Sequence, residues 1–411
     1  MIGAAVEQPE PEQGRSSRLT AEFWLCNLGN LLILTGSVMF VLLPAYWAQA
    51  GMARWEMGLT DGAFWLVSVF VQPWLGPRLD RDGRTRYLVG GSFLMGLAAA
   101  GYAFVPVAFA PMVALRLAHG LGFAMYLTSS WTWVADYAPP GRVGELFGVF
   151  GISGMISGAV GPALAEFVQQ HYQYRGLFLV GASLIALGWL FVLGLKEHAP
   201  RSDQLEKLPH FFGLITTRAM RGTAIGALGF GVAVGSLFAF VAPLLQSLNV
   251  AGIGGLFACT TLASGASRVF AGRQTDQLGP HRLIVPALVS LAVGSYGLGQ
   301  LGASGDLMVV VLVGSGLSAG LGYGVIYPAL NSLALRRLAP AARGRGLSVV
   351  TAAIDAGSTA GAALCGLMAH HFGYPRAFTS VALLVAFFAF AFWGSERTQH
   401  DGLDVVRRKD R

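Results

Sequence analysis

The stretch GPRLDRDGRTR, residues 76–86, decides the fold of this chain. It is a short charged turn between two long apolar runs. A weaker copy, GRQTDQLGPHR, occupies residues 272–282 and also lies between apolar runs. At a constant offset of 196 residues, four positions of the first copy keep their identity in the second: Gly76, Asp80, Gly83 and Arg86 recur as Gly272, Asp276, Gly279 and Arg282. The repeat predicts a duplicated architecture.

The composition indicates a membrane protein. Of 411 residues, 54% are hydrophobic and only 12% are charged, against about 25% charged in soluble domains. The net charge of +7 could suit nucleic acid, but the basic residues lie in short loops and not on one face, so no nucleic-acid partner is expected. Cys26, Cys259 and Cys365 lie in apolar runs without motif spacing, so neither disulfides nor a metal site is predicted. No cofactor is expected.

Apolar runs of about 20 residues are long enough to cross a bilayer. The sequence predicts an all-α protein with twelve transmembrane helices, at 21–48, 57–77, 87–107, 110–136, 144–168, 176–195, 222–246, 251–271, 283–301, 306–333, 346–369 and 377–394. They are expected to form two six-helix bundles, 21–195 and 222–395, joined by a charged cytoplasmic linker, 196–221. Residues 1–20 are predicted to be a disordered cytoplasmic tail, and 396–411 a second cytoplasmic tail.

The lysines and arginines predict the orientation, because they concentrate on the cytoplasmic side of membrane proteins. With an even number of spans, both termini lie on one side. The loops of the opposite side carry only Arg54, Arg175 and Arg376. Both termini are therefore expected in the cytoplasm, with the chain in the bacterial inner membrane.

Further matches relate the two halves. Pro44 corresponds to Pro243, and the GLGF sequence at 120–123 corresponds to GLGY at 320–323. Parallel six-helix repeats place a transport pathway at the interface between halves.

On these residues, the chain resembles the major facilitator superfamily over almost its whole length after residue 20, and within it the bacterial proton-linked efflux branch. The family signature between spans 2 and 3 matches Gly76, Asp80 and Gly83. Arg78 and Leu79 stand where the family usually has leucine and alanine. The resemblance implies a secondary transporter, not an enzyme, that works by alternating access around one central site.

The resemblance also implies a cytoplasmic gate. It places Asp80 near the start of span 346–369, where unpaired N–H groups and the positive helix end favour a carboxylate. Asp276 is expected to contact the start of span 144–168 in the same way. The alternative is that both are solvated loop residues. The predicted gate motif comprises Gly76, Asp80, Gly83, Arg84, Arg86, Gly272, Asp276, Gly279 and Arg282.

Ionisable residues inside predicted spans are candidates for proton coupling. Arg116, followed by a small-residue patch, resembles the family's span-4 signature, and His119 beside it could titrate near neutral pH. Alternatively, Arg116 is a structural residue paired with Asp61.

Asp355 lies eight or nine residues into span 346–369, and Arg268 lies at a comparable depth in span 251–271. An ion pair between them is expected. A permanent pair would be structural, whereas a pair that a proton or solute breaks would be the coupling switch.

The spans that line the family's pathway supply the predicted substrate cavity: Asn27, Asn30, Tyr126, Ser130, Trp133, Phe230, Phe238, Tyr323, Tyr327 and Asn331. An aromatic lining with few charges favours an amphipathic or weakly charged solute. Alternatively, about half of these residues pack between helices or anchor the protein at the membrane interface. Gly158, Gly161 and Pro162 are predicted to serve close helix packing and resemble the family's antiporter signature, with Ser157 and Ala165 replacing two of its glycines.

The expected function is proton-coupled efflux of a small organic solute by a monomer in the lipid bilayer. One alternative is a proton-coupled importer or exchanger of an organic acid, sugar or metal chelate. A second is a non-transporting membrane sensor. No phosphate-binding loop, metal-ligand spacing or nucleophile triad points to an enzyme.

Overall fold

The computed structural model describes residues 20–138, 142–197, 213, 217–338 and 343–409. Within these ranges the chain is helical and has no strand, so the predicted all-α class is confirmed. The predicted first tail lies outside the described residues except for Thr20, as does most of the predicted linker.

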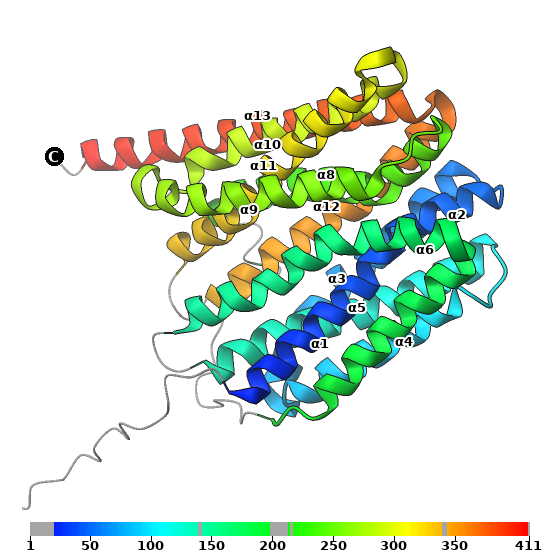
Figure 1. Cartoon of the computed structure of the whole chain (residues 1–411). Helices are drawn as coiled ribbons and strands as arrows, with labels where there is room; N and C mark the ends of the chain where they lie inside the picture. Colours follow the sequence, from blue (N-terminus) through cyan, green and yellow to red (C-terminus); the bar gives the residue numbers. More distant parts are fainter. Residues whose placement is uncertain (1–19, 139–141, 198–212, 214–216, 339–342, 410–411) are drawn as a thin grey trace, which may run out of the picture.

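The N-terminal helices follow the predicted spans (Figure 1). They are α1 (Ala21–Val38), the 3-10 helix η1 (Met39–Leu42), α2 (Leu43–Gln49), α3 (Arg54–Asp82), α4 (Thr85–Gly101), α5 (Phe109–Tyr137) and α6 (Val143–Leu193). Pro44 stands in the first turn of α2, where the missing N–H of proline costs little. The predicted span 21–48 is therefore one membrane segment made of three short helical pieces.

Helix α6 contains two predicted spans, 144–168 and 176–195. Gln173 interrupts it with a non-helical backbone, φ 59° and ψ −178°. Positive φ is uncommon for a residue with a Cβ, so this one position carries the turn between two helical rods.

The C-terminal helices are α8 (Arg218–Ser247), α9 (Ile253–Leu278), α10 (His281–Gln300), the 3-10 helices η2 (Leu301–Ala303) and η3 (Gly305–Leu307), α11 (Met308–Arg337), α12 (Arg343–Phe372) and α13 (Tyr374–Lys409). Helix α13 continues well beyond the predicted span 377–394, so the backbone of the predicted second tail is helical as far as residue 409. Gly83 and Gly279 end α3 and α9 with φ 92° and 82°, which gives the repeated motif the same backbone form in both halves.

Eight segments in the described part are long and apolar enough to cross a membrane: 21–49, 109–137, 145–193, 220–247, 281–303, 305–337, 346–372 and 374–397. The chain is thus a multi-pass membrane protein. The third segment includes two predicted spans, while α3, α4 and α9 are not among the eight. Helix α4 has only 17 residues, and α3 and α9 carry the charged motif at their ends. Twelve crossings therefore remain a prediction.

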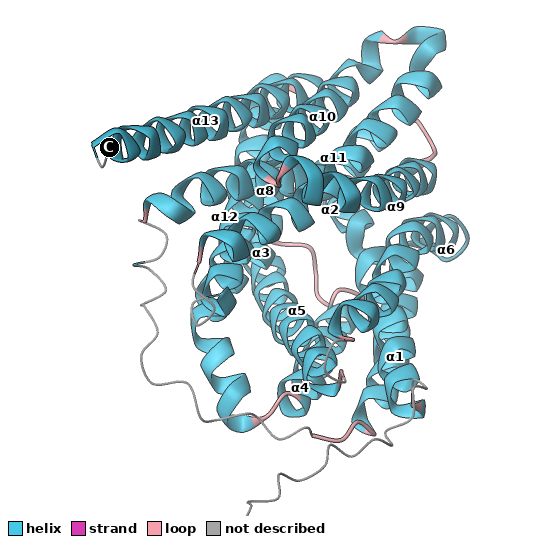
Figure 2. Cartoon of the chain, turned by 90° about the vertical axis from the view of Figure 1, so that its left-hand side faces the viewer, coloured by secondary structure: helices cyan, strands magenta, loops and turns pink. Residues whose placement is uncertain are grey.

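The helices pack mainly within two groups, α1–α6 and α8–α13 (Figures 1 and 2). The main contacts between the groups are those of α3 with α12 and of α6 with α9, and α8 makes smaller contacts with η1, α2 and α3. Glycines allow the first pair to approach closely: a Cβ on Gly58 would lie 2.6 Å from the Ala362 carbonyl oxygen, and one on Gly62 3.1 Å from that of Thr359. We call the two groups the N-terminal and C-terminal halves.

Candidate functional site

Asp355 lies where α12 packs on α3, and its side chain is buried. The Ser68 hydroxyl of α3 donates a hydrogen bond to its Oδ2 atom. One turn along α12, Thr359 donates to the Gly62 carbonyl at 3.3 Å. A buried carboxylate is costly unless it is hydrogen-bonded. Asp355 therefore joins the two halves through a polar contact and does not face lipid.

The predicted ion pair between Arg268 and Asp355 is not formed in this structure. Within the described residues Arg268 makes no salt bridge, and its Nε is buried without a hydrogen-bond partner. Asp355 is instead bonded to Ser68. The sequence placed both residues at similar depth, but the pairing of side chains on α9 and α12 depends on how the helices are rotated and spaced.

Tyr327 brings several predicted residues together on α11. Asn331, Tyr323, Asp355 and Arg268 all lie within electrostatic range of its hydroxyl group. The Tyr327 side chain is 44% exposed although it stands near the middle of α11. The C-terminal half thus holds an aromatic and charged cluster around an accessible tyrosine. We call this group the Tyr327 cluster; its members are Tyr323, Tyr327, Asn331, Arg268 and Asp355.

Phe230 and Phe238 of α8 differ in their neighbours. The Phe230 ring packs edge-on against the ring of Tyr323, with centroids 5.3 Å apart. Phe230 therefore packs against Tyr323, one member of the Tyr327 cluster. Phe238 packs against Phe257, at 5.4 Å, and belongs to a separate contact with α9.

The predicted cavity residues of the N-terminal half mainly pack with one another. Tyr126 donates to Asn30 Oδ1 at 2.8 Å, and Asn30 donates to Ser153 Oγ at 2.6 Å. Ser130 donates to the Leu127 carbonyl, and Trp133 is fully buried. Asn30 and Tyr126 therefore join α1, α5 and α6, whereas the Ser130 hydroxyl bonds within α5 and Trp133 packs in the core of this half.

Asn27 is also buried, and its Oδ1 has no hydrogen-bond partner within the described chain. The polar atoms of Asn30 and Tyr126 are used by neighbouring helices. An unsatisfied amide is costly, so Asn27 is the one predicted cavity residue described in this half whose side chain keeps a polar atom available.

Arg116 and Asp61 form a buried ion pair between α5 and α3. The guanidinium also lies 5.0 Å from the ring centroid of Phe64 and 5.6 Å from that of Trp47. Both charges are thus compensated inside the N-terminal half. This geometry favours the structural alternative for Arg116.

His119 packs among aromatic rings, edge-on to Phe40 at 5.2 Å and to Phe64 at 5.4 Å. It is fully buried, and neither ring nitrogen has a hydrogen-bond partner among the described residues. Its described ring contacts are with aromatic side chains, so the geometry favours a packing role over a titrating one.

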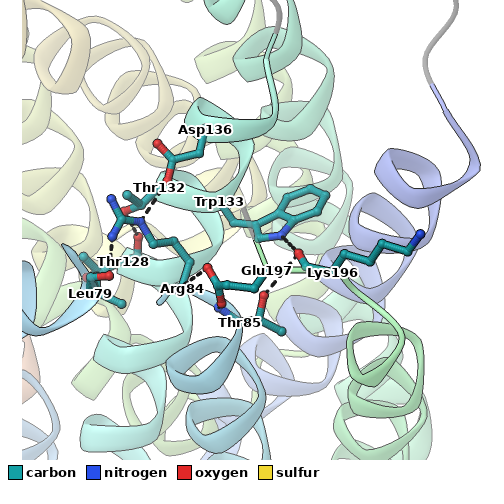
Figure 3. A network of polar contacts seen from close by, with 9 residues as sticks. All are labelled: Leu79, Arg84, Thr85, Thr128, Thr132, Trp133, Asp136, Lys196 and Glu197. Carbon is teal, nitrogen blue, oxygen red and sulfur yellow. Dashed lines mark hydrogen bonds and ion pairs between the residues drawn. The ribbon is translucent and has the colours of Figure 1, made fainter. Parts of the chain in front are cut away.

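The first motif forms a polar network around Arg84 (Figure 3). Arg84 Nε lies 2.8 Å from Asp136 Oδ2, and its Nη1 donates to the Leu79 carbonyl. The backbone amides of Arg84 and Thr85 each donate to the Glu197 carboxylate, at 2.8 Å. Glu197 thereby caps the start of α4. The network ties the turn after α3 to α5 and to the start of the linker.

The gate contacts predicted for Asp80 and Asp276 lie outside what the structure describes, because neither aspartate side chain is described. The surroundings of Gly272 in the same motif are not described either. Asp82 is described: Arg81 donates to it at 2.9 Å and Tyr87 at 2.8 Å. These hydrogen bonds, that of Arg81 first, lower the pKa of Asp82 from its ordinary value. Asp82 is therefore satisfied within its own half.

Gly161 and Gly158 lie in the part of α6 that meets its neighbours. A Cβ on Gly161 would lie 3.0 Å from Val38 Cβ of α1, and one on Gly158 3.4 Å from Thr261 Oγ1 of α9. Pro162 follows Gly161 directly, inside α6. The predicted packing stripe thus contacts both its own half and the opposite one.

Two charged residues that the sequence did not single out join the halves at one end. Glu166 of α6 accepts hydrogen bonds from the backbone amides of Gly252 and Gly254, at 2.9 and 3.1 Å, at the start of α9. Arg54 of α3 donates to the Ala369 carbonyl at 2.7 Å, in the last turn of α12. An anion at a helix N-terminus and a cation at a C-terminus are both favourable.

The halves separate towards the other end. Along α3, contacts with α12 run from Arg54 through Gly58 and Gly62 to Ser68. A Cβ on Gly76, two turns further, would meet no described atom within 4 Å. In the part of the chain that the structure describes, the halves are therefore joined at the end that carries Arg54 and diverge towards the end that carries the repeated motif (Figure 1).

The contacts between α6 and α9 also become fewer towards the end that carries the repeated motif. Gly254 of α9 approaches Ala163 so closely that its Cβ would lie 2.8 Å from Ala163 Cα. A Cβ on Gly148, nearer the motif end, would have no described neighbour within 4 Å. Both helix pairs that join the halves thus part in the same direction.

These observations define a class: a helical, multi-pass membrane protein built of two halves with buried polar groups between them. Residues 25–335 and 223–408 match the Major Facilitator Superfamily, so the chain belongs to this family, whose members are transporters and not enzymes. The resemblance inferred from the motif is confirmed.

The chain is similar to a multi-drug resistance efflux pump, the PmrA homolog of Lactococcus lactis subsp. lactis (strain IL1403), at 26% identity over 74% of this chain and 76% of that protein. It is 24% identical to the multidrug resistance protein MdtG of Rahnella sp. (strain Y9602), over 90% and 93% of the two chains. Among solved structures it resembles the nucleoside transporter NupG, with a TM-score of 0.76, 15% identity, and coverage of 92% and 99%.

Proposed function

We propose that this protein exports small amphipathic organic solutes across the bacterial inner membrane in exchange for protons, working as a monomer by alternating access between residues 21–195 and 222–395. The observation that carries the proposal is the buried Asp355 carboxylate, bonded across the interface to Ser68. The names of the two relatives, a multi-drug efflux pump and a multidrug resistance protein, support efflux.

The conformation supports a direction of solute entry. The predicted orientation puts Arg54 and Glu166 on the outer side and the repeated motif on the cytoplasmic side. Since the halves are joined at the first end and part towards the second, this is the state in which solute enters from the cytoplasm. Export then requires breaking the Arg54 and Glu166 contacts.

Proton exchange follows from the position of Asp355. A carboxylate makes stronger hydrogen bonds than a neutral carboxyl group, so protonation weakens its contact with Ser68 across the halves. Arg268, whose Nε has no hydrogen-bond partner in the described chain, is the cation that the ionised Asp355 would pair with in another state. Protonation would thereby release Asp355 from Ser68 of the opposite half, and deprotonation in the other state would let its carboxylate pair with Arg268 of its own half.

The Tyr327 cluster supports the choice of solute. Tyr323 and Tyr327 offer aromatic faces beside Asp355, and such surfaces bind apolar rings while a carboxylate favours a positive or hydrogen-bond-donating group. An amphipathic solute with a donor or cationic group fits this combination best.

Transport into inside-out membrane vesicles tests the proposal. An exporter accumulates solute when the vesicle interior is acidified, and a panel of amphipathic amines and aromatic cations serves as probe. We expect Asp355→Asn to abolish this accumulation, whereas Asp306→Asn, an exposed residue of η3, should leave it unchanged.

The alternatives give different results. An importer or exchanger would accumulate solute in right-side-out vesicles instead. A sensor would move no solute, and solute would trigger no proton movement. Accumulation by Asp355→Asn equal to that of the wild type would refute the assigned role of Asp355.

A further inference from the structure

A pocket lies where α10 begins beside α13, away from the interface between the halves. Its volume is about 540 Å³. The apolar wall consists of Val285, Phe392 and Trp393, and the polar wall of His281, Arg282, Glu396 and Arg397. The pocket is therefore amphipathic, and nothing in the proposed transport cycle uses it.

The charges in the pocket favour an anion. Arg282 is exposed, and the Arg397 guanidinium stacks 3.7 Å from the ring centroid of Trp393. Glu396 also lines the pocket, but its charge is paired: its Oε2 accepts from Arg337 Nη2 at 2.5 Å, and Arg337 also donates to Thr223 of α8 at 3.2 Å. The one acidic group is thus neutralised by an arginine outside the pocket. The positive end of α10, which has no side-chain cap, adds to the field.

The apolar wall continues along the outer faces of both helices. Val289 and Val293 of α10 are 46% and 56% exposed, and Phe387 and Phe390 of α13 are 60% and 66% exposed. Trp393 stands between this apolar surface and the arginines. Tryptophan is enriched at this level of membrane proteins because its ring is amphipathic. A ligand that fits the whole surface has an anionic head and a long apolar chain.

We propose that this pocket binds an anionic phospholipid of the cytoplasmic leaflet, with the lipid phosphate on Arg282 and Arg397 and an acyl chain along α10 and α13. The proposal rests on the orientation in the proposed function, which puts the start of α10 at the cytoplasmic surface. Anionic lipids of that surface attract basic residues. Arg282 would then bind a lipid phosphate. The sequence repeat matches Arg282 with Arg86 but does not indicate this role.

Native mass spectrometry of the purified full chain tests lipid binding directly. The probes are phosphatidylglycerol and phosphatidylcholine with identical acyl chains, and inorganic phosphate. We expect the wild type to retain phosphatidylglycerol in preference to phosphatidylcholine. Each arginine removed should weaken binding roughly fivefold, so Arg282→Gln/Arg397→Gln should weaken it roughly 25-fold. Arg221→Gln, an exposed arginine of α8 that does not line the pocket, is the matched control.

Equal affinity of the double variant and the wild type for phosphatidylglycerol would overturn the proposal, as would equal retention of both lipids. Inorganic phosphate that binds as tightly as the lipid would make this a small-anion site and overturn the lipid assignment. If the double variant does not fold, the single variant Arg282→Gln is measured instead, because this side chain is exposed. A fivefold loss of phosphatidylglycerol affinity would then support the proposal, and an unchanged affinity would overturn it. Because no transport is measured, lipid binding can fail or succeed independently of the transport experiment.

Discussion

Arg54 donates a hydrogen bond to the carbonyl oxygen of Ala369, 2.7 Å away, and so joins the start of α3 to the end of α12. Its guanidinium also lies 4.6 Å from the ring centroid of Tyr374. Glu166 makes the complementary contact at the start of α9. Contacts between a charge and a helix end contribute about 0.3–1 kcal/mol when exposed and ~2 kcal/mol when partly buried. Together they bias the protein towards closure at this end without locking it.

Removing either charge is expected to open this end more often. For Arg54→Gln or Glu166→Gln, a loss of about 1 kcal/mol raises the open population roughly fivefold. The measurement is the labelling rate of a thiol introduced by Ala45→Cys, at a buried position of α2 that lines the same pocket as Glu166 and becomes accessible only when this end opens. Cys259, which is partly exposed, is first replaced by serine, while Cys26 and Cys365 are buried.

Arg175→Gln is the control for this experiment. Arg175 is an exposed arginine on the same predicted side, and its guanidinium lies over Phe104 of its own half at 5.4 Å. Its loss should leave the labelling rate unchanged. Labelling that rises equally in all three variants would indicate general loosening, and the contacts of Arg54 and Glu166 would then have no special part in closure.

The buried pair of Arg116 and Asp61 predicts a large loss of stability when one partner is removed. Breaking such a pair costs about 3–5 kcal/mol because the remaining charge is buried without compensation. We expect Arg116→Met and Asp61→Leu each to lower the thermal unfolding temperature in detergent strongly. The double variant Arg116→Met/Asp61→Leu should regain most of the loss, since apolar replacements of a buried pair are often tolerated.

The double variant also separates the two interpretations of Arg116. A structural pair predicts that the stable double variant still couples solute export to protons. A stable double variant that moves solute without proton exchange would show that Arg116 takes part in coupling, as its resemblance to the family signature suggests.

Arg84 predicts a smaller, local effect. Its side chain is buried, and Arg84→Gln removes both the ion pair with Asp136 and the hydrogen bond to the Leu79 carbonyl. Since Asp136 is partly exposed, we expect a loss of about 1–3 kcal/mol in the free energy of unfolding. Thermal unfolding checks this. Arg81→Gln, whose side chain is 79% exposed, is the control and should unfold like the wild type; equal losses would contradict the network.

Apolar runs and a repeated motif were enough to predict the helices and the family. Hydrophobic length predicts where a helix lies, and a charged residue inside such a run predicts that it needs a partner. The alternative pairing of Arg116 with Asp61 followed from this reasoning. It succeeded because each charge has few possible partners within its own half.

The missed contacts have partners that carry no sequence signal. Glu166 binds backbone amides 86 and 88 positions away along the chain, and every residue except proline has such an amide. The Ser68 hydroxyl, bonded to Asp355, looks like any small residue in an apolar helix. The expected pair of Arg268 and Asp355 is not formed in this structure for a different reason: depth along two helices can be read from a sequence, but their rotation and the conformational state cannot.

The motif aspartate Asp80 allows a test of the cytoplasmic gate with a neighbour as control. If its carboxylate binds the start of α12 when the cytoplasmic end closes, Asp80→Asn weakens closure by about 1 kcal/mol and slows export roughly fivefold. Asp82→Asn makes the same change of charge two residues away, but Asp82 is bonded to Arg81 and Tyr87 of its own half. Its loss should leave the export rate close to that of the wild type. Solute flux in inside-out vesicles at equal protein content compares the two. Equal rates for Asp80→Asn and the wild type would mean that the carboxylate is a solvated residue of the turn, and that the motif acts through Arg84 and its backbone alone.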